Sequence, residues 1–411
     1  MDLRRRLHAA LALLLVPTLV VSLPAGAVVL VAWAIVGVAS RLAPAAAAMT
    51  VAALVAAVVG VVHAPSVVFA VAAVASAATL GWVWRRMGAT VDASAAAWVG
   101  VGAAATAVAI AGASLAQALA SGFAQTQVAS THPNLTGAMA LALGAASALA
   151  VRRFGWLGWA LATLGVAASL GTVLLTGSRG TGVGVVLGAL ALVVIGLAWV
   201  LARRRPLAAT VVAFGGPLLL LVAFQAIAFS PQRADAWWPR TVATVGDAMG
   251  VDESTPIGRR FLDLREPMGQ TGGRLVNWRV TRELIAVRPF LGFGLDAVHS
   301  VYRNEALFRT STPLAHPHHG PLTLALQGGA LLLVAVAALV LTVGWSLAGA
   351  AVRGDGVAAV VLAFGVGVVG ADLLDVVMVQ GVVAGTLAVA ALGALARDGE
   401  KHPRVEGGRE S

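Results

Sequence analysis

Long uncharged runs separated by small arginine clusters constrain this chain more than any other feature of its sequence. A soluble domain usually has about a quarter charged residues, whereas only 11% of these 411 residues are charged and 59% are hydrophobic. A water-soluble fold of this length could not bury so much apolar surface. The composition therefore excludes a soluble enzyme and predicts an all-α polytopic membrane protein, because helices satisfy their own backbone hydrogen bonds in lipid.

The arginine clusters predict how the helices alternate across the membrane. These clusters stand at Arg4–Arg6, Arg41, Arg85–Arg86, Arg152–Arg153, Arg203–Arg205, Arg353 and from Arg397 onward. Basic residues in short loops favour the cytoplasm, so an even number of spans should separate each neighbouring pair. The runs fit this rule, with breaks at His63–Pro65, at 117–132 and at Gly177–Gly180. About twelve spans result, with both termini in the cytoplasm.

This map divides the chain into four parts. Residues 1–229 hold transmembrane helices 1–9, residues 230–315 form an extracytoplasmic loop with short helices, residues 316–396 hold helices 10–12, and residues 397–411 form a cytoplasmic tail. The ninth span is expected at about 207–229. The first run leaves two alternatives open, one long tilted helix or two short helices that turn near Pro24 and Gly26. The even-number rule favours two.

The net charge and the lack of cysteine limit which partners and which catalytic groups this chain can have. The formal net charge of +10 fits arginine in cytoplasmic loops, so we predict the lipid bilayer and no nucleic acid as a partner. The chain has no cysteine, which excludes disulfides, thiolate nucleophiles and cysteine-ligated metals.

The long outer loop contains a helix-like stretch over 272–294. Gly272 and Gly273 precede it, and Pro289 and Gly292 end it. Arg274, Trp278 and Arg282 follow one another at intervals of four residues, so they share a face of the predicted helix. An interfacial helix with snorkelling arginines and an anchoring tryptophan is an equally simple interpretation.

Three histidines close the loop where the chain re-enters the membrane. His316, His318 and His319 have three interpretations: ordinary surface side chains, metal ligands, or a general base among them. Neither His-Glu-x-x-His spacing nor an Asp-x-Asp pair occurs in the outward loops, which weakens the metal hypothesis.

Arg179 is the only basic residue predicted in a short outward loop. It could be a lone interfacial anchor. Together with Arg274 it could also bind a phosphorylated ligand, because guanidinium groups bind phosphate oxygens through two parallel hydrogen bonds. Gly180, Gly184 and Gly188 follow at helical spacing and predict a close approach of neighbouring helices.

These residues resemble the O-antigen ligase family, which includes O-antigen polymerases and related oligosaccharyl transferases. The similarity rests on Ser178-Arg179-Gly180 at the start of a span, on Arg274 and Trp278 before Arg288-Pro289-Phe290-Leu291-Gly292-Phe293-Gly294, on His318 with Gly329 eleven residues later, and on Thr131-His132-Pro133-Asn134. It covers about residues 130–350, and the predicted span layout fits the family. Three positions depart from the family pattern: His319 stands where Asn is usual, Gln327 where an acidic residue is frequent, and Leu332 where the second glycine of a Gly-x-x-Gly stretch is usual.

The resemblance implies a reaction. A glycan passes from an undecaprenyl-pyrophosphate carrier to a sugar hydroxyl of a glycan or glycolipid acceptor, outside the bacterial cytoplasmic membrane. It implies that Arg179 and Arg274 stabilise the leaving pyrophosphate and that His318 is the general base, with no cofactor and no metal. Further substrate-binding candidates are Arg282, Arg288, His319, Trp278 and Asn134. Ligation and polymerisation remain alternatives, since both use the same donor.

A proton-coupled secondary transporter is the main alternative from another class. Asp372 and Asp375 support it, because ionisable groups at membrane depth often mark ion or proton pathways. The chain shows no repeat between its halves, which argues against transport.

Overall fold

The computed structural model describes residues 3–36, 44–121, 128, 132–203, 269–305, 316–373, 376 and 381–396. Within these ranges every regular element is helical, as the composition predicts, and none is a strand. The predicted span at 207–229, the predicted tail at 397–411 and Asp375 lie outside the described residues. So do the side chains of Arg179 and Arg274, although their backbones are described.

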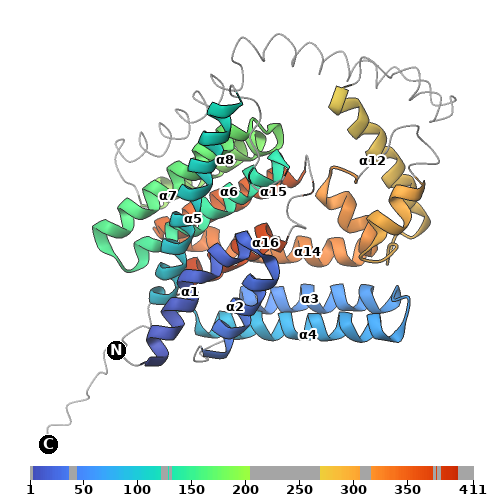
Figure 1. Ribbon diagram of the computed structural model, residues 1–411, viewed down its shortest axis with the longest axis horizontal. Coiled ribbons are helices and arrows are strands. Elements are labelled where there is room, and N and C mark those ends of the chain that lie inside the picture. Colours follow the sequence, from blue (N-terminus) through green and yellow to red (C-terminus); the bar gives the residue numbers. More distant parts are fainter. Residues whose placement is uncertain are drawn as a thin grey trace, which may run out of the picture.

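The first four helices form two hairpins. They are α1 (Leu3–Val21), α2 (Leu23–Val36), α3 (Pro44–Val62) and α4 (Val67–Thr90). Residues 7–36 therefore form two short helices rather than one long one, as the even-number rule favours, although the break falls at Ser22. The α3–α4 turn falls at the predicted break (Figure 1).

The middle of the chain adds four α-helices, one of which is central to the bundle. They are α5 (Ala93–Ala120), α6 (Pro133–Ser147) with its 3-10 extension η1 (Ala148–Arg152), α7 (Gly155–Thr176) and α8 (Arg179–Arg203). In the span 133–152, 89% of residues are buried inside the protein. This central helix packs against α5, α7, α15 and α16, so it is surrounded by protein rather than by lipid.

The C-terminal part contributes α12, which lies in the predicted outer loop, and three apolar helices. The elements are α12 (Gly269–Val287), the π-helical turn η2 (Val298–Tyr302), α14 (Gly320–Val352), α15 (Gly356–Asp372) and α16 (Gly381–Leu395). The sequence places the end of α12 correctly but not its start. Gly272 and Gly273 lie inside the helix instead of preceding it.

Seven described helices are long and apolar enough to cross a membrane. Four shorter apolar helices accompany them: Arg6–Val21, Ala25–Ala34, Gly356–Asp372 and Val382–Leu395. The chain is a multi-pass membrane protein, and the total of about twelve spans stays a prediction.

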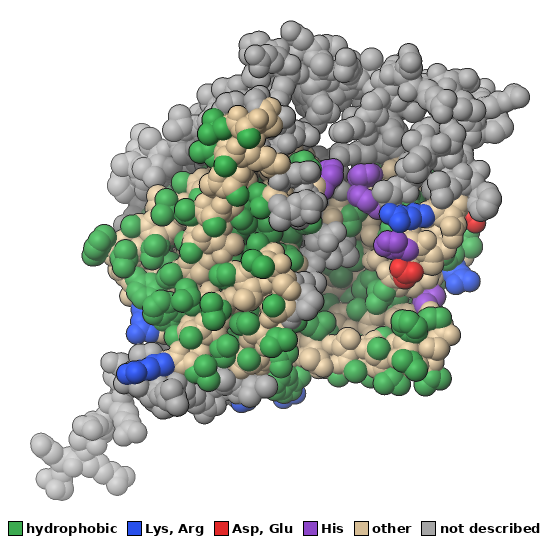
Figure 2. Space-filling view, in the orientation of Figure 1, with side chains coloured by type: hydrophobic (Ala, Val, Ile, Leu, Met, Phe, Trp, Pro, Cys, Tyr) green, Lys and Arg blue, Asp and Glu red, His purple; other side chains and the backbone are tan. Residues whose placement is uncertain are grey.

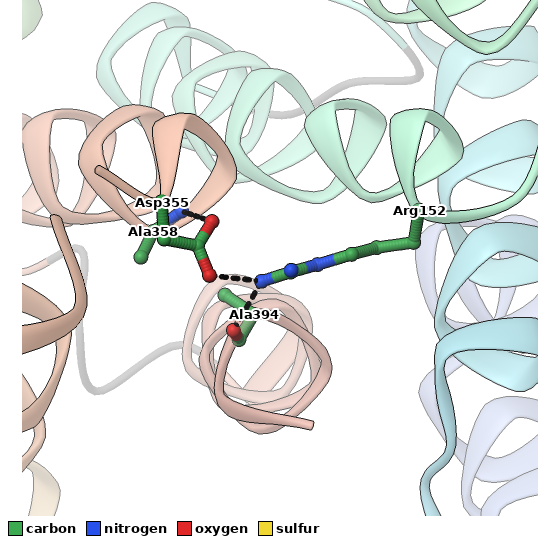
Figure 3. A network of polar contacts seen from close by, with 4 residues as sticks. All are labelled: Arg152, Asp355, Ala358 and Ala394. Carbon is green, nitrogen blue, oxygen red and sulfur yellow. Dashed lines mark hydrogen bonds and ion pairs between the residues drawn. The ribbon is translucent and has the colours of Figure 1, made fainter. Parts of the chain in front are cut away.

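Polar contacts join the segments that the arginine pattern assigns to the cytoplasm. Arg152 forms an ion pair of 2.6 Å with Asp355 and donates to the carbonyl oxygen of Ala394, also at 2.6 Å (Figure 3). Asp355 caps α15 at the same time by accepting from the backbone N–H of Ala358 at 3.1 Å. The ends of η1 and α16 and the start of α15 therefore meet, as the even-number rule requires.

Small residues let α8 and α15 approach closely. A Cβ atom at Gly184 would overlap the carbonyl oxygen of Gly367, and one at Gly188 would lie 2.6 Å from the carbonyl oxygen of Ala363. The close approach predicted from the glycine spacing is confirmed at these two positions. This packing brings the last turn of α15 beside the first turns of α8, because Ala371 lies 3.5 Å from the same Cβ position at Gly184.

The helix α14 is broken at two glycines near its outer end. Gly328 has φ −128° and ψ 16°, and Gly329 has φ 59° and ψ −157°. A straight helix would bond the N–H of Ala330 to the carbonyl of Leu326, and the N–H of Leu331 to that of Gln327. The break frees all four groups.

The turn that follows α12 satisfies each freed group. Phe293 and Gly294 donate to the carbonyls of Leu326 and Gln327 at 2.9 and 2.8 Å. Ala330 and Leu331 donate to the carbonyls of Pro289 and Phe290 at 2.7 and 3.2 Å. Two helical hydrogen bonds are thus exchanged for four between distant segments, which suits a membrane boundary where unpaired backbone groups are costly.

The tip of the α3–α4 hairpin contacts the same turn. His63 lies with Nε2 3.0 Å from the carbonyl oxygen of Gly292 and Nδ1 3.0 Å from that of Val59. In Figure 1 the orange segment that follows α12 lies below α12 and above the end of the α3–α4 hairpin. The α3–α4 hairpin therefore supports the turn over residues 289–294, which in turn contacts α14.

Replacing Gly329 with alanine tests this arrangement. A Cβ atom there would overlap the Phe290 carbonyl, and φ is in the left-handed region, so Gly329→Ala should lower the free energy of unfolding by about 1–3 kcal/mol. Gly365→Ala in α15 is the matched control, since its Cβ would meet nothing within 4 Å. Thermal unfolding in detergent measures both. An equal midpoint for the two variants would contradict the interlocked break.

Candidate functional site

The three-histidine turn, residues 316–319, lies directly before α14. His318 has φ 52°, and it is the one residue other than glycine with a positive φ in the described part of the chain. A left-handed backbone at a non-glycine residue is uncommon and costs about 1–3 kcal/mol, and such residues cluster at functional sites. The backbone therefore distinguishes His318 from the two histidines beside it.

The side chains of the two neighbouring histidines accept hydrogen bonds from backbone N–H groups. Nδ1 of His316 accepts from the N–H of His318 at 3.2 Å, and Nδ1 of His319 accepts from the N–H of Leu322 at 3.2 Å. Both neutral rings therefore carry their proton on Nε2. His319 is the N-cap of α14, which explains how histidine replaces the asparagine usual in the family, since both side chains offer an acceptor at this position.

One face of α12 packs against this turn. Asn277, only 3% exposed, donates from Nδ2 to the carbonyl oxygen of His316 at 3.3 Å. The Trp278 ring meets His319 edge-on, with 5.1 Å between ring centroids. Arg274 precedes Asn277 by three residues and thus belongs to the same face, by helical spacing. Figure 2 shows several histidine side chains on the side of the molecule where α12 and the start of α14 lie.

Asp372 ends α15 beside the same turn. Its side chain is buried, with 6% exposed, and a Cβ atom at Gly320 would overlap its carboxylate. The carboxylate therefore lies against the first residue of α14, where the helix dipole favours negative charge. The contact with the start of α14 explains why a carboxylate is buried here, and no proton pathway is needed to explain it. The transporter interpretation therefore finds no support.

A second polar group lies where α6 and α8 begin. Asn134, 8% exposed, accepts a hydrogen bond from the Ser178 hydroxyl. Ser178 also accepts from the N–H of Thr181 at 3.3 Å and so caps the helix that Arg179 opens. Both Asn134 and Arg179 therefore lie at helix starts, next to each other in space.

The tight α8–α15 packing connects the two groups. Ala371 approaches Gly184, five residues after Arg179, and Asp372 follows directly and contacts Gly320. The start of α8, the end of α15 and the start of α14 thus lie at one end of the molecule.

Two predicted substrate-binding arginines lie further along the chain, Arg282 within α12 and Arg288 directly after its last residue. Arg282 is exposed, two turns after Arg274. The guanidinium of Arg288 stacks over the Phe293 ring at 5.1 Å and lies about 20 Å from Arg274 along the helix axis, at 1.5 Å per residue. The structure therefore does not bring Arg288 to the three-histidine turn.

Sequence reasoning missed Asn277 and the place of Asp372. Asn277 carried a weak signal, since it shares the helix face of Arg274. Among the described residues, no group of three or more His, Cys, Asp or Glu side chains is arranged to hold a metal ion.

The fold and this site define a multi-pass membrane protein with a cluster of polar side chains at one end of its helices. Residues 164–337 match the family model described as O-antigen ligase, and the matched segment contains Arg179, Arg274 and His318. This match supports the assignment of the chain to the O-antigen ligase family. No curated protein matches it. The family indicates an enzyme of surface polysaccharide ligation or polymerisation, with a lipid-linked glycan donor and a glycan acceptor.

The cap on α14 should depend on pH. Burial lowers the pKa of His319 below its ordinary value of 6.5, so the folded protein favours the neutral ring. Its contribution to stability is therefore complete above pH 6.5 and is lost as the pH falls through the lowered pKa.

Asparagine at this position keeps the cap without titrating. The unfolding midpoint of the wild type should fall relative to that of His319→Asn as the pH decreases below 6.5. Thermal unfolding of both proteins between pH 8 and about pH 5 checks this. Parallel curves would show that His319 is not the capping residue.

Proposed function

We propose that this protein transfers a glycan from undecaprenyl-pyrophosphate to a sugar hydroxyl of a glycan or glycolipid acceptor, on the extracytoplasmic side of the bacterial cytoplasmic membrane. One observation carries the proposal: His318 has a strained, left-handed backbone in a turn that packs against the helix face of Arg274. The arginine pattern supports the sidedness, with both termini in the cytoplasm.

The reaction requires two kinds of group. The acceptor oxygen attacks the anomeric carbon of the donor glycan while the bond from that carbon to the carrier phosphate oxygen breaks. The electron pair leaves with the pyrophosphate, and the acceptor proton passes to a base. Positive charge must therefore face the leaving group, and a titratable side chain must face the hydroxyl.

The candidate residues suit these roles. In our proposal Arg179 and Arg274 bind the pyrophosphate, because guanidinium stays charged at every physiological pH. His318 takes the proton, since a neutral imidazole nitrogen can act as a general base. The Asp372 carboxylate, close to the start of α14, then stabilises the imidazolium that forms.

The remaining predicted residues have supporting roles in this proposal. His319 and Trp278 line the turn and the facing helix, and Asn134 holds the Ser178 cap beside Arg179. Arg282 lies on the exposed side of α12, where it could meet the charged donor during its approach. We assign Arg288 a structural role next to the turn over residues 289–294, where it stacks on Phe293, and no contact with the substrate.

Alanine at the two best candidates tests the proposal. Arg274→Ala and His318→Ala should each lower glycan transfer by about a hundredfold or more, because each removes charge stabilisation or the base. A complementation assay and transfer from a purified carrier-linked glycan measure this, alongside membrane insertion and accumulation.

Matched controls lie in the same part of the chain. Arg279→Ala removes an exposed arginine of α12 whose partner is Glu283, and His299→Ala removes an exposed histidine paired with Asp296. Both should keep near-normal transfer. Near-normal product from Arg274→Ala and His318→Ala would overturn the assignment.

The proposal also expects metal independence, because two guanidinium groups supply the positive charge that a metal ion would otherwise provide. Transfer by the purified protein should persist after treatment with EDTA. Activity that is lost with the chelator and restored by a divalent cation would contradict the arginine mechanism.

A further inference from the structure

Asn277 connects α12 to the three-histidine turn. Its side chain is almost completely buried, and Nδ2 donates to the carbonyl oxygen of His316 at 3.3 Å. Its own carbonyl oxygen accepts from the Thr281 hydroxyl at 2.6 Å, within the helix. The bond to His316 is therefore the contact by which this residue reaches beyond α12.

His316, which Asn277 holds through its backbone carbonyl, in turn contacts His318. The ring nitrogen Nδ1 of His316 accepts from the backbone N–H of His318 at 3.2 Å, and the two ring centroids lie 3.9 Å apart. A side-chain acceptor for the N–H two residues on is the geometry of an Asx-turn, which tolerates left-handed backbone nearby. Asn277 holds His316, and His316 holds the unusual backbone of His318.

The amide oxygen of Asn277 lowers the stability of the fold. Its Oδ1 atom is buried and makes no hydrogen bond to any residue that the structure describes. A buried acceptor without a partner destabilises a fold, whereas an apolar side chain of similar volume would not. Stability alone therefore does not explain an asparagine here.

We propose that Asn277 is a positioning residue: it fixes the distance between the proposed general base His318 and α12, the helix that carries Arg274. Arg274 lies three residues before it on the same helix, so one hydrogen bond sets the spacing between the helix of Arg274 and the turn of His318. This inference rests on the proposed function. A displacement of about 1 Å between reacting groups can cost a hundredfold in rate, which makes such a restraint valuable.

Asn277→Leu separates positioning from a structural role, because it should lower turnover while changing stability little. The unfolding midpoint should stay close to that of the wild type, since the loss of the hydrogen bond to His316 is offset by removal of the unpaired amide oxygen. The kcat for glycan transfer should fall about tenfold or more, while KM for the carrier-linked donor changes less than about threefold. Thr281→Val is the matched control, one turn further along α12, and should keep wild-type kcat.

A second pair of variants tests the same link without altering α12. His316→Asn keeps an acceptor for the His318 N–H and should retain most of the activity, whereas His316→Ala should show the low kcat of Asn277→Leu. This pair also decides the matter if Asn277→Leu fails to accumulate.

Three results would overturn the inference: wild-type kcat in Asn277→Leu, a parallel loss of stability and activity in Asn277→Leu and Thr281→Val, or equal activity in the two His316 variants. Failure of the proposed function looks different, because His318→Ala would then stay active. An inactive His318→Ala beside a fully active Asn277→Leu would preserve the proposed function and reject only the positioning role.

Discussion

The break in α14 is the constraint on which the arrangement of α12 and the three-histidine turn depends. Backbone groups freed at Gly328 and Gly329 need partners, because unpaired polar groups at a membrane boundary are costly. The turn over residues 289–294 provides four hydrogen bonds to them, and in return its own path becomes fixed. Since α12 ends just before this turn, the break also determines where α12 can lie.

The candidate site follows from that geometry. The short arm of α14 before the break carries the three-histidine turn at its start, and α12 lies against this turn through Asn277 and Trp278. From the other side, the glycine contacts between α8 and α15 bring Asp372 to Gly320. Segments remote in sequence thus converge on one end of the bundle, and the family match covers most of them.

Sequence reasoning was most successful where the physics is local. Uncharged runs and arginine clusters predicted the described apolar helices, and the glycine spacing predicted the α8–α15 contact. It failed where the outcome depends on contacts between distant residues. Asp372 suggested proton transport because it is an ionisable residue in an apolar segment. Its contact with Gly320, which explains its position, cannot be predicted from the sequence around either residue. Gln327 looked like a departure from the family, yet its side chain ties the short arm to the carbonyl of Leu295 at 2.8 Å.

The central claim is that Arg179, Arg274 and His318 meet on the extracytoplasmic side. The chain contains no cysteine, so single substitutions give an unambiguous label. We expect Arg179→Cys, Arg274→Cys and His318→Cys to react with a membrane-impermeant maleimide in spheroplasts, and Arg353→Cys to react only after permeabilisation. If Arg179→Cys reacts only after permeabilisation while His318→Cys reacts before it, the residues lie on opposite sides, and the proposed site does not exist.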